Sequence, residues 1–185
     1  MKIYQAKTIQ KIIGIPKHRY DYILMKIRIE PDVEKVIGTG NTNLFSFKKL
    51  MEFAIASTAI DIGMSPEVIR FSIESIRKAD ELWNWHLFEP DVEIKPLSYH
   101  VVSNMGALFY CFSGDVHKQA TCPTIFKTPD GINFEQTMRP NWNMEMIAKV
   151  ANFAQGLISD GIKEALGYLT LNLSEIKKTV NARNL

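Results

Sequence analysis

Basic side chains crowd the first 28 residues, and their chemistry is that of phosphate binding. Segment 1–28 holds seven Lys and Arg residues against Asp21, a net charge of +6. The whole chain carries +2, so the other 157 residues carry −4. Lys and Arg displace the counterions condensed on nucleic-acid phosphates, and an Arg can also pair with guanine. The charge therefore favours an anionic partner for this segment, and a solvated helical face that keeps the protein soluble is the alternative.

Candidate metal and catalytic groups lie further along the chain. His100, Cys111, His117 and Cys122 are soft metal ligands in one region, but their spacing contains no tight Cys-x2-Cys pair. A Cys–His nucleophile would need both groups within hydrogen-bond reach and an activated thiolate. Gly38-Thr39-Gly40 lacks the third glycine of a dinucleotide site, and no pair of carboxylates stands out for acid–base work. We therefore predict no enzyme activity, no metal site and no cofactor.

Length and composition place the chain among ordinary globular proteins. It has 185 residues, of which 46% are hydrophobic and 23% are charged, and these fractions exclude a disordered chain or a collagen-like fibre. No apolar run reaches the roughly 18 residues of a membrane span, and no signal-peptide core follows segment 1–7. Two cysteines are too few for a disulfide framework. We expect a cytoplasmic protein without a membrane partner.

The basic segment predicts two short helices joined by a tight turn. Residues 8–13 form an amphipathic stretch that Thr8 can cap, and Gly14 interrupts it. Pro16 suits the first turn of a second helix over 17–25. The apolar side of that helix, at helical spacing, is Tyr20, Ile23 and Leu24. A helix-turn-helix unit of this kind presents the N-terminus of its second helix to the major groove of DNA, and here that end carries a Lys-His-Arg cluster.

A hairpin and two longer helices follow. Segment 38–43 is rich in Gly and Asn, which tolerate positive φ, so it predicts the tip of a hairpin between two apolar pairs. Ser46 then caps a helix over 47–62. After Gly63, Ser65 and a proline start a fourth helix that extends to about residue 85.

This order of elements resembles the winged-helix DNA-binding domain of the MerR-like regulators. Four phrases carry the resemblance: Ile12-Ile13-Gly14-Ile15-Pro16, Arg19-Tyr20, Leu44-Phe45-Ser46-Phe47-Lys48-Lys49-Leu50 and Ile62-Gly63-Met64-Ser65-Pro66-Glu67-Val68-Ile69. The wing departs from the family pattern, because Asn43-Leu44-Phe45 lacks the arginine that normally precedes the aromatic residue. The resemblance covers about 75 of the 185 residues.

The resemblance implies double-stranded DNA as the partner, a homodimer on a two-fold site, and a C-terminal part that responds to a small-molecule effector or a metal. We expect DNA contacts from basic and polar side chains of the helices and the hairpin. These are Lys7, Lys11, Lys17, His18, Arg19, Tyr22, Lys26, Arg28, Lys35, Thr39, Asn41, Asn43 and Lys48. Tyr20 is expected in the core, and the core also suits Tyr22 slightly better than a phosphate contact.

The C-terminal half predicts a sheet with a helical cover. Segment 80–93 has five acidic residues and no Lys or Arg, and we interpret 79–91 as a connector. Short β-forming segments from residue 92 onward predict three to five antiparallel strands. Apolar residues recur at helical spacing over about 25 residues from Asn141 or Asn143. Residues 169–173 alternate again, and Ser174 begins a last short helix.

We therefore predict an α+β protein with a winged helix-turn-helix at 1–78, a connector at 79–91, and a dimerisation or sensor domain at 92–185. The last domain is a small antiparallel sheet packed with a long C-terminal helix. The predicted function is sequence-specific DNA binding in transcription regulation. Two alternatives stay open: an architectural MerR-like protein of the phage-excision or segregation type, and a ligand- or protein-binding module without a DNA role.

Overall fold

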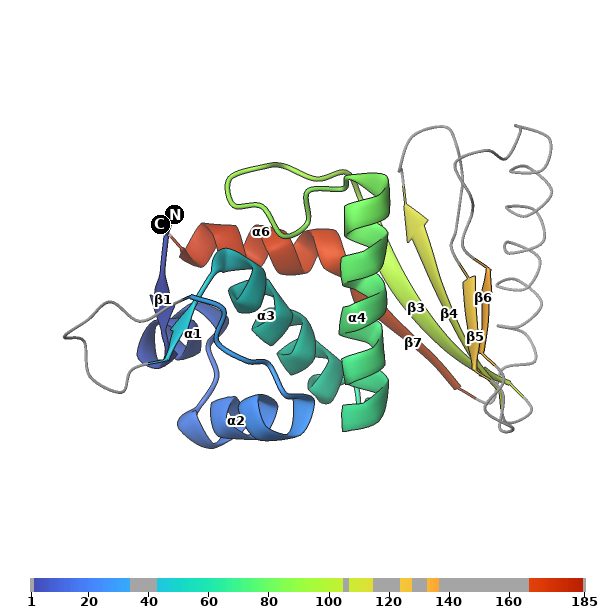
Figure 1. The fold of residues 1–185 in the computed structure, drawn as a ribbon, viewed down its shortest axis with the longest axis horizontal. Helices are drawn as coiled ribbons and strands as arrows, with labels where there is room; N and C mark the ends of the chain where they lie inside the picture. Colours follow the sequence, from blue (N-terminus) through green and yellow to red (C-terminus); the bar gives the residue numbers. More distant parts are fainter. Residues whose placement is uncertain are drawn as a thin grey trace. The chain divides into compact units, whose positions relative to one another are not determined.

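The computed structural model describes residues 2–33, 43–104, 107–114, 124–127, 133–136 and 167–184. The chain divides into two compact units, which are considered separately (Figure 1). The first unit combines residues 1–94 with 174–185, and the second spans 95–173. Among the described residues, helices predominate in the first unit and antiparallel strands in the second, so the predicted α+β class is confirmed.

The first unit begins with a short strand and two short helices. β1 (Tyr4–Gln5) leads directly into α1 (Ala6–Ile13), and α2 (Lys17–Tyr22) continues into a π-helical turn, η1 (Ile23–Ile27). Gln5 is the N-cap of α1 and makes no side-chain capping bond, so the prediction that Thr8 caps this helix is wrong. Antiparallel pairing of β1 aligns the chain before Thr8, and the helix starts three residues earlier than a Thr8 cap would place it. The predicted second helix over 17–25 is present, with its last part widened into the π turn.

The partner of β1 is β2 (Leu44–Phe45), with Tyr4 opposite Phe45. Val33 also forms an antiparallel bridge with Leu44. These two residues, which flank segment 34–43, therefore lie side by side. The predicted hairpin tip, with its flanking pair 36–37, lies outside the described residues.

Two longer helices form the framework on which the first two helices rest. α3 (Phe47–Asp61) and α4 (Pro66–Trp83) start where predicted, because the Ser46 and Ser65 hydroxyls accept hydrogen bonds from backbone N–H groups three residues ahead. The core consists mainly of aliphatic and aromatic side chains from these helices and from the two-helix unit. Its members include Ile9, Ile12, Tyr20, Ile23, Phe45, Leu50, Phe53, Ile69 and Ile76. The Tyr20 ring stacks on Phe53 with centroids 5.0 Å apart, which confirms its expected place in the core.

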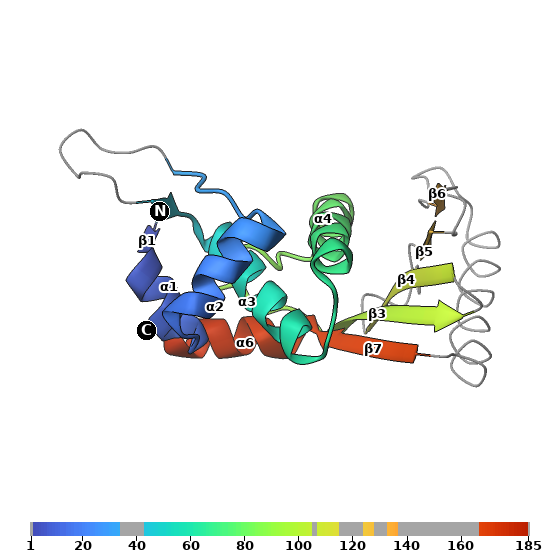
Figure 2. The ribbon, with the colours of Figure 1, turned by 90° about the horizontal axis from the view of Figure 1, so that it is seen from below.

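The last helix, α6 (Leu173–Arg183), belongs to the first unit. It lies alongside α1 and α3 in both Figure 1 and Figure 2. Asn184 donates from Nδ2 to the Tyr4 hydroxyl over 2.9 Å, and Lys2 donates to the Asn184 carbonyl, so the two chain ends lie together. The predicted C-terminal domain was expected to reach residue 185, whereas the observed second unit ends at residue 173 and residues 174–185 belong to the first unit. Apolar residues of α6, such as the buried Val180, are covered by the first unit.

A buried lysine fastens α6 to the segment after α4. The Lys177 ammonium donates to the His86 carbonyl, and the residue is only 2% exposed. Burial lowers its pKa to about 8, although the nearby carboxylates Asp80, Glu89 and Asp91 act in the opposite direction. Asp80 also accepts from the Leu87 backbone N–H over 2.8 Å, so the acidic, Trp-containing segment expected as a connector packs against the first unit.

Lys177 should make the free energy of unfolding rise with pH in the alkaline range. The unfolded chain holds this proton up to a pKa near 10.5, whereas the folded chain releases it near 8, so the unfolded state binds more protons between these pH values. We expect the difference in stability between the native protein and a Lys177→Met variant to increase from pH 8 to pH 10, measured by urea denaturation. The comparison cancels the opposite contribution of Tyr4 and Tyr20, whose pKa values are raised by burial. If the stability difference between the two proteins stayed constant from pH 8 to pH 10, the lowered pKa of Lys177 would be contradicted.

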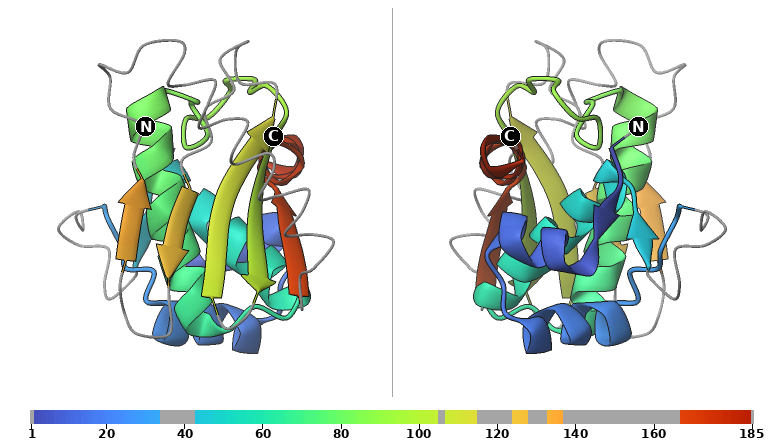
Figure 3. Two further views of the ribbon diagram at one scale, coloured as in Figure 1. Left: turned by 90° about the vertical axis from the view of Figure 1, so that its right-hand side faces the viewer. Right: turned by 90° about the vertical axis from the view of Figure 1, so that its left-hand side faces the viewer.

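The second unit contains a five-stranded antiparallel sheet. Its strands are β3 (Leu97–Asn104), β4 (Ala107–Gly114), β5 (Thr124–Lys127), β6 (Asn133–Gln136) and β7 (Gly167–Asn172). They are ordered β6-β5-β4-β3-β7, as Figure 3 shows. Tyr99 lies opposite Phe112 in the register, with ring centroids 4.9 Å apart. Strands are therefore confirmed in five segments predicted to form them between residues 99 and 173, whereas 92–95, whose residues also alternate, is not a strand.

The predicted helix beginning at Asn141 or Asn143 lies outside the described residues. Ser174 was expected to cap the last helix, but it lies inside α6, which begins one residue earlier at Leu173. The alternating segment that was predicted as a strand up to residue 173 ends as β7 at Asn172 and passes into α6 without an intervening loop.

Candidate nucleic-acid interface

The two-helix unit is amphipathic, with its basic side turned outward. In α1, Ile9 and Ile12 are buried while Lys7 and Lys11 are exposed. In α2 and η1, the buried residues are Tyr20, Ile23 and Ile27. The exposed ones include Lys17, His18, Tyr22, Lys26 and Arg28. The hydrophobic anchoring of one side thus leaves the cations accessible to a partner.

The turn between α1 and α2 depends on Gly14. Its φ of +81° is a left-handed conformation that favours glycine, and its N–H bonds the Gln10 carbonyl over 2.8 Å. Arg183 of α6 donates to the Ile12 and Ile13 carbonyls, at 3.3 and 3.1 Å. A Cβ on Gly14 would lie 3.2 Å from that guanidinium. The last helix of the chain therefore caps the first, where α1 exposes unpaired carbonyls.

Two side chains of α2 that were expected to contact DNA are exposed. The Lys17 side chain is 81% exposed, and its ion pair with Asp21, at 2.8 Å, is a surface pair of little strength. Tyr22 is 38% exposed and leaves the core to Tyr20, so the interpretation of Tyr22 as a core residue is wrong. Its hydroxyl is available for a phosphate, as the alternative interpretation proposed.

Arg19 has a different environment from its neighbours. Its guanidinium pairs with Asp61 over 2.7 Å and donates to the Ser57 carbonyl over 3.1 Å, and its side chain is 24% exposed. Both partners lie at the C-terminal end of α3. Arg19 therefore attaches α2 to α3 in this structure, and a contact between its NH2 group and DNA would require that group to leave Asp61.

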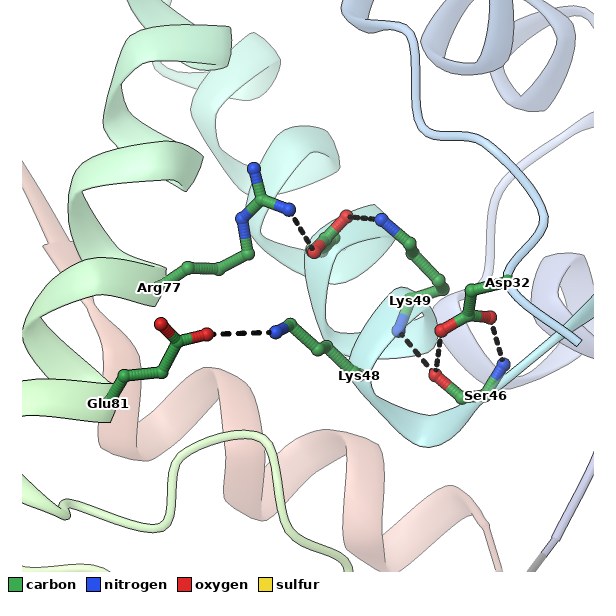
Figure 4. A network of polar contacts seen from close by, with 7 residues as sticks. Asp32, Ser46, Lys48, Lys49, Arg77 and Glu81 are labelled. Carbon is green, nitrogen blue, oxygen red and sulfur yellow. Dashed lines mark hydrogen bonds and ion pairs between the residues drawn. The ribbon is translucent and has the colours of Figure 1, made fainter.

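The region around the predicted wing contributes two described candidates. Asn43 is exposed, whereas Lys48 pairs with Glu81 of α4 at 3.3 Å and lies over the Phe88 ring. Lys35, Thr39 and Asn41 lie outside the described residues. Asp32 accepts hydrogen bonds from both the backbone N–H and the hydroxyl of Ser46, and Figure 4 shows Ser46 between Asp32 and Lys49. The start of α3 is thereby fixed to the segment that precedes the predicted wing.

Three residues that position this surface were not found from the sequence. Asp32, Asp61 and Arg183 act on partners 14, 42 and up to 171 positions away. Single charged residues at such separations carry no periodic or motif signal.

The candidate metal ligands give no further site in the part of the chain that the structure describes. His100 is buried, its Nδ1 lies 3.1 Å from the Thr170 hydroxyl, and burial lowers its pKa. Cys111 belongs to β4, whereas His117 and Cys122 lie outside the described residues. Among described residues, no group of three or more His, Cys, Asp or Glu side chains is arranged to hold a metal. Within the same residues, every helix is too short or too polar to cross a membrane.

Curated relatives come from mycobacteria. An 87-residue stretch is 28% identical to proteins named "uncharacterized HTH-type transcriptional regulator" in Mycobacterium bovis and in two strains of Mycobacterium tuberculosis. The match covers 46% of this chain and 39% of each relative, so the chain accounts for less than half of the proteins it resembles. No protein-family profile matches the chain. The names of these relatives support a helix-turn-helix regulator in general, without specifying its family.

Proposed function

We propose that this chain is a DNA-binding transcription regulator that holds duplex DNA with the exposed basic side of α1, α2 and η1. The main support is that apolar and basic side chains lie on opposite sides of the two-helix unit. Its aliphatic and aromatic residues are buried, while Lys7, Lys11, Lys17, His18, Lys26 and Arg28 are exposed. The helix-turn-helix names of the mycobacterial relatives support the same function.

Within this proposal, α2 enters the major groove, and the lysines of α1 and η1, together with Lys17 at the start of α2, contact phosphates. Lys17, His18 and Tyr22 are the residues of α2 that are exposed enough to reach DNA without rearrangement. The finer proposals are a MerR-like wing that includes Lys35, Thr39, Asn41 and Asn43, and a homodimer on a two-fold site. Sequencing of duplexes that the protein selects from random DNA tests them, because a dimer requires a two-fold consensus.

The phosphate contacts predict a strong dependence of affinity on salt. Fluorescence anisotropy with a selected duplex should show log affinity falling linearly with log salt concentration. Lys17→Ala should reduce the steepness of that line by about one unit, as expected for the loss of one phosphate contact. Lys178→Ala is the matched control, because Lys178 is also a lysine in a surface ion pair and is 78% exposed.

The control lysine lies on α6, outside the two-helix unit. Its replacement should leave the salt dependence unchanged. Equal reductions for both variants, or affinity that does not respond to salt, would exclude the proposed interface.

A further inference from the structure

A pocket of about 210 Å³ lies in the first unit, and its lining includes none of the exposed lysines of α1 and α2. It is bounded by residues 27–29, by Lys49 and Glu52 of α3, and by the face of α4 that carries Arg70 and Arg77. Drug-sized ligands occupy pockets of roughly 300–1,000 Å³, so this one suits a smaller molecule. Ile27, Ile29 and Ile73 supply an apolar part of the lining.

The lining has an excess of positive charge. Four cationic side chains, Arg28, Lys49, Arg70 and Arg77, face two carboxylates, Glu52 and Glu74, which leaves a net charge of +2. A phosphomonoester carries a charge of about −1.5 to −2 at pH 7 and offers three acceptor oxygens. A monocarboxylate would neutralise only half of the excess.

Not all of these cations are already engaged. Lys49 and Arg77 approach the buried Glu52 carboxylate at 2.9 and 3.7 Å, and Figure 4 shows both side chains reaching inward from α3 and α4. Arg28 and Arg70, by contrast, make no hydrogen bond or ion pair within the described part of the chain. Their guanidinium groups present planar sets of donors that fit phosphate oxygens.

The carboxylate of Glu52 adds a second kind of recognition. Glu52 is 2% exposed, and its Oε1 atom accepts no hydrogen bond from any described residue. A buried acceptor without a donor is costly, so a hydroxyl group on a ligand would find a favourable partner there. The pocket thus combines anion-binding arginines, an apolar wall and an acceptor for a hydroxyl.

We propose that this pocket binds a small hydroxylated phosphomonoester, with Arg28 and Arg70 holding the phosphate and Glu52 accepting from a hydroxyl. The proposal does not rest on DNA binding, because none of its three polar contacts requires a nucleic acid. A ligand of this kind would be a candidate effector, bound in the first unit instead of the second unit expected to hold a sensor.

Isothermal titration of the full chain with glycerol 3-phosphate tests the proposal, with glycerol as the neutral control. We expect saturable binding at one site for the phosphomonoester and none for glycerol. Arg70→Gln should weaken binding at least about fivefold, since a charge-assisted pair is lost. Lys178→Gln, which removes an equal charge on α6, should have no effect. Arg70 is exposed and unpaired in the described part of the chain, so its replacement should not impair folding.

Three results would overturn the assignment. The first is the absence of saturable binding by glycerol 3-phosphate. The second is an equal loss of affinity in Arg70→Gln and Lys178→Gln, which would indicate a general effect of charge. The third is tighter binding of malate, a hydroxylated dicarboxylate, at the same ionic strength. If the arginines serve DNA instead, Arg70→Gln would weaken duplex binding while the phosphomonoester fails to bind.

Discussion

Replacing Glu52 with glutamine is expected to lower the free energy of unfolding by about 3 kcal/mol, because it leaves the largely buried Lys49 ammonium without its counter-charge. The Glu52 side chain is 3% exposed, and Lys49, its partner at 2.9 Å, is 14% exposed. Arg77 approaches the other carboxylate oxygen at 3.7 Å. Glutamine has nearly the same shape, so the loss would report the charge and not a cavity. Urea denaturation followed by circular dichroism measures it.

The matched control is Glu81→Gln on α4. Glu81 also pairs with a lysine of α3, at 3.3 Å from Lys48, but its side chain is 68% exposed. Water screens such a pair, so the expected loss is below about 1 kcal/mol. A double variant with Glu52→Gln and Lys49→Met should recover part of the stability, because it removes both the anion and the most deeply buried cation. Equal losses of stability for Glu52→Gln and Glu81→Gln would show that burial does not strengthen the ion pairs of Glu52 with Lys49 and Arg77.

Elements with local signals were predictable from the sequence. Ser46 and Ser65 cap helices because a hydroxyl can satisfy an N–H three residues ahead whatever the rest of the chain does. Gly14 ends α1 because few other residues adopt its positive φ. The run of β-forming residues likewise located β4. The alternation of apolar residues located β7, since side chains of a strand point to opposite faces.

Contacts between distant segments were not predictable. The pairing of Leu44-Phe45 with Tyr4-Gln5 at the start of the chain has no signal in the sequence. The docking of α6 on α1 likewise joins positions about 170 residues apart. Glu52 would be placed on a solvated face by its polarity, but α3 is buried around most of its circumference. Each of these depends on tertiary packing, which outweighs local preference.

At the candidate interface, likewise, the sequence predicted the local charge but not the contacts of each charged side chain. Sequence charge identified the basic segment, and the structure exposes most of its cations. Charge could not distinguish Lys17, which faces solvent, from Arg19, which is held by α3. The two roles of a cation, contacting DNA or orienting the helix that does, differ only in which partner it has.

Arg19→Ala is expected to weaken binding to a selected duplex about tenfold to a hundredfold, in the range of one well-placed recognition contact. The structure indicates that this loss would come from α2 losing its attachment to α3. The guanidinium bonds both Asp61 and the Ser57 carbonyl, and its Nε is buried without a hydrogen-bond partner in the described part of the chain. Anisotropy measurements on the native protein and the variant give the change.

Asp61→Asn separates a positioning role from direct contact with DNA. Asparagine keeps an acceptor for Arg19 but removes the charge that holds it at 2.7 Å. If Arg19 orients α2, Asp61→Asn should also weaken specific binding, and neither variant should change the slope of log affinity against log salt, because no phosphate contact is lost. If Arg19 instead reaches the duplex, Asp61→Asn should leave affinity unchanged or raise it, since a competing carboxylate is gone. Arg19→Ala would then also reduce the slope by about one unit if the contact is to a phosphate. The sign of the Asp61 effect therefore decides whether this arginine reads the duplex or holds the helix that does.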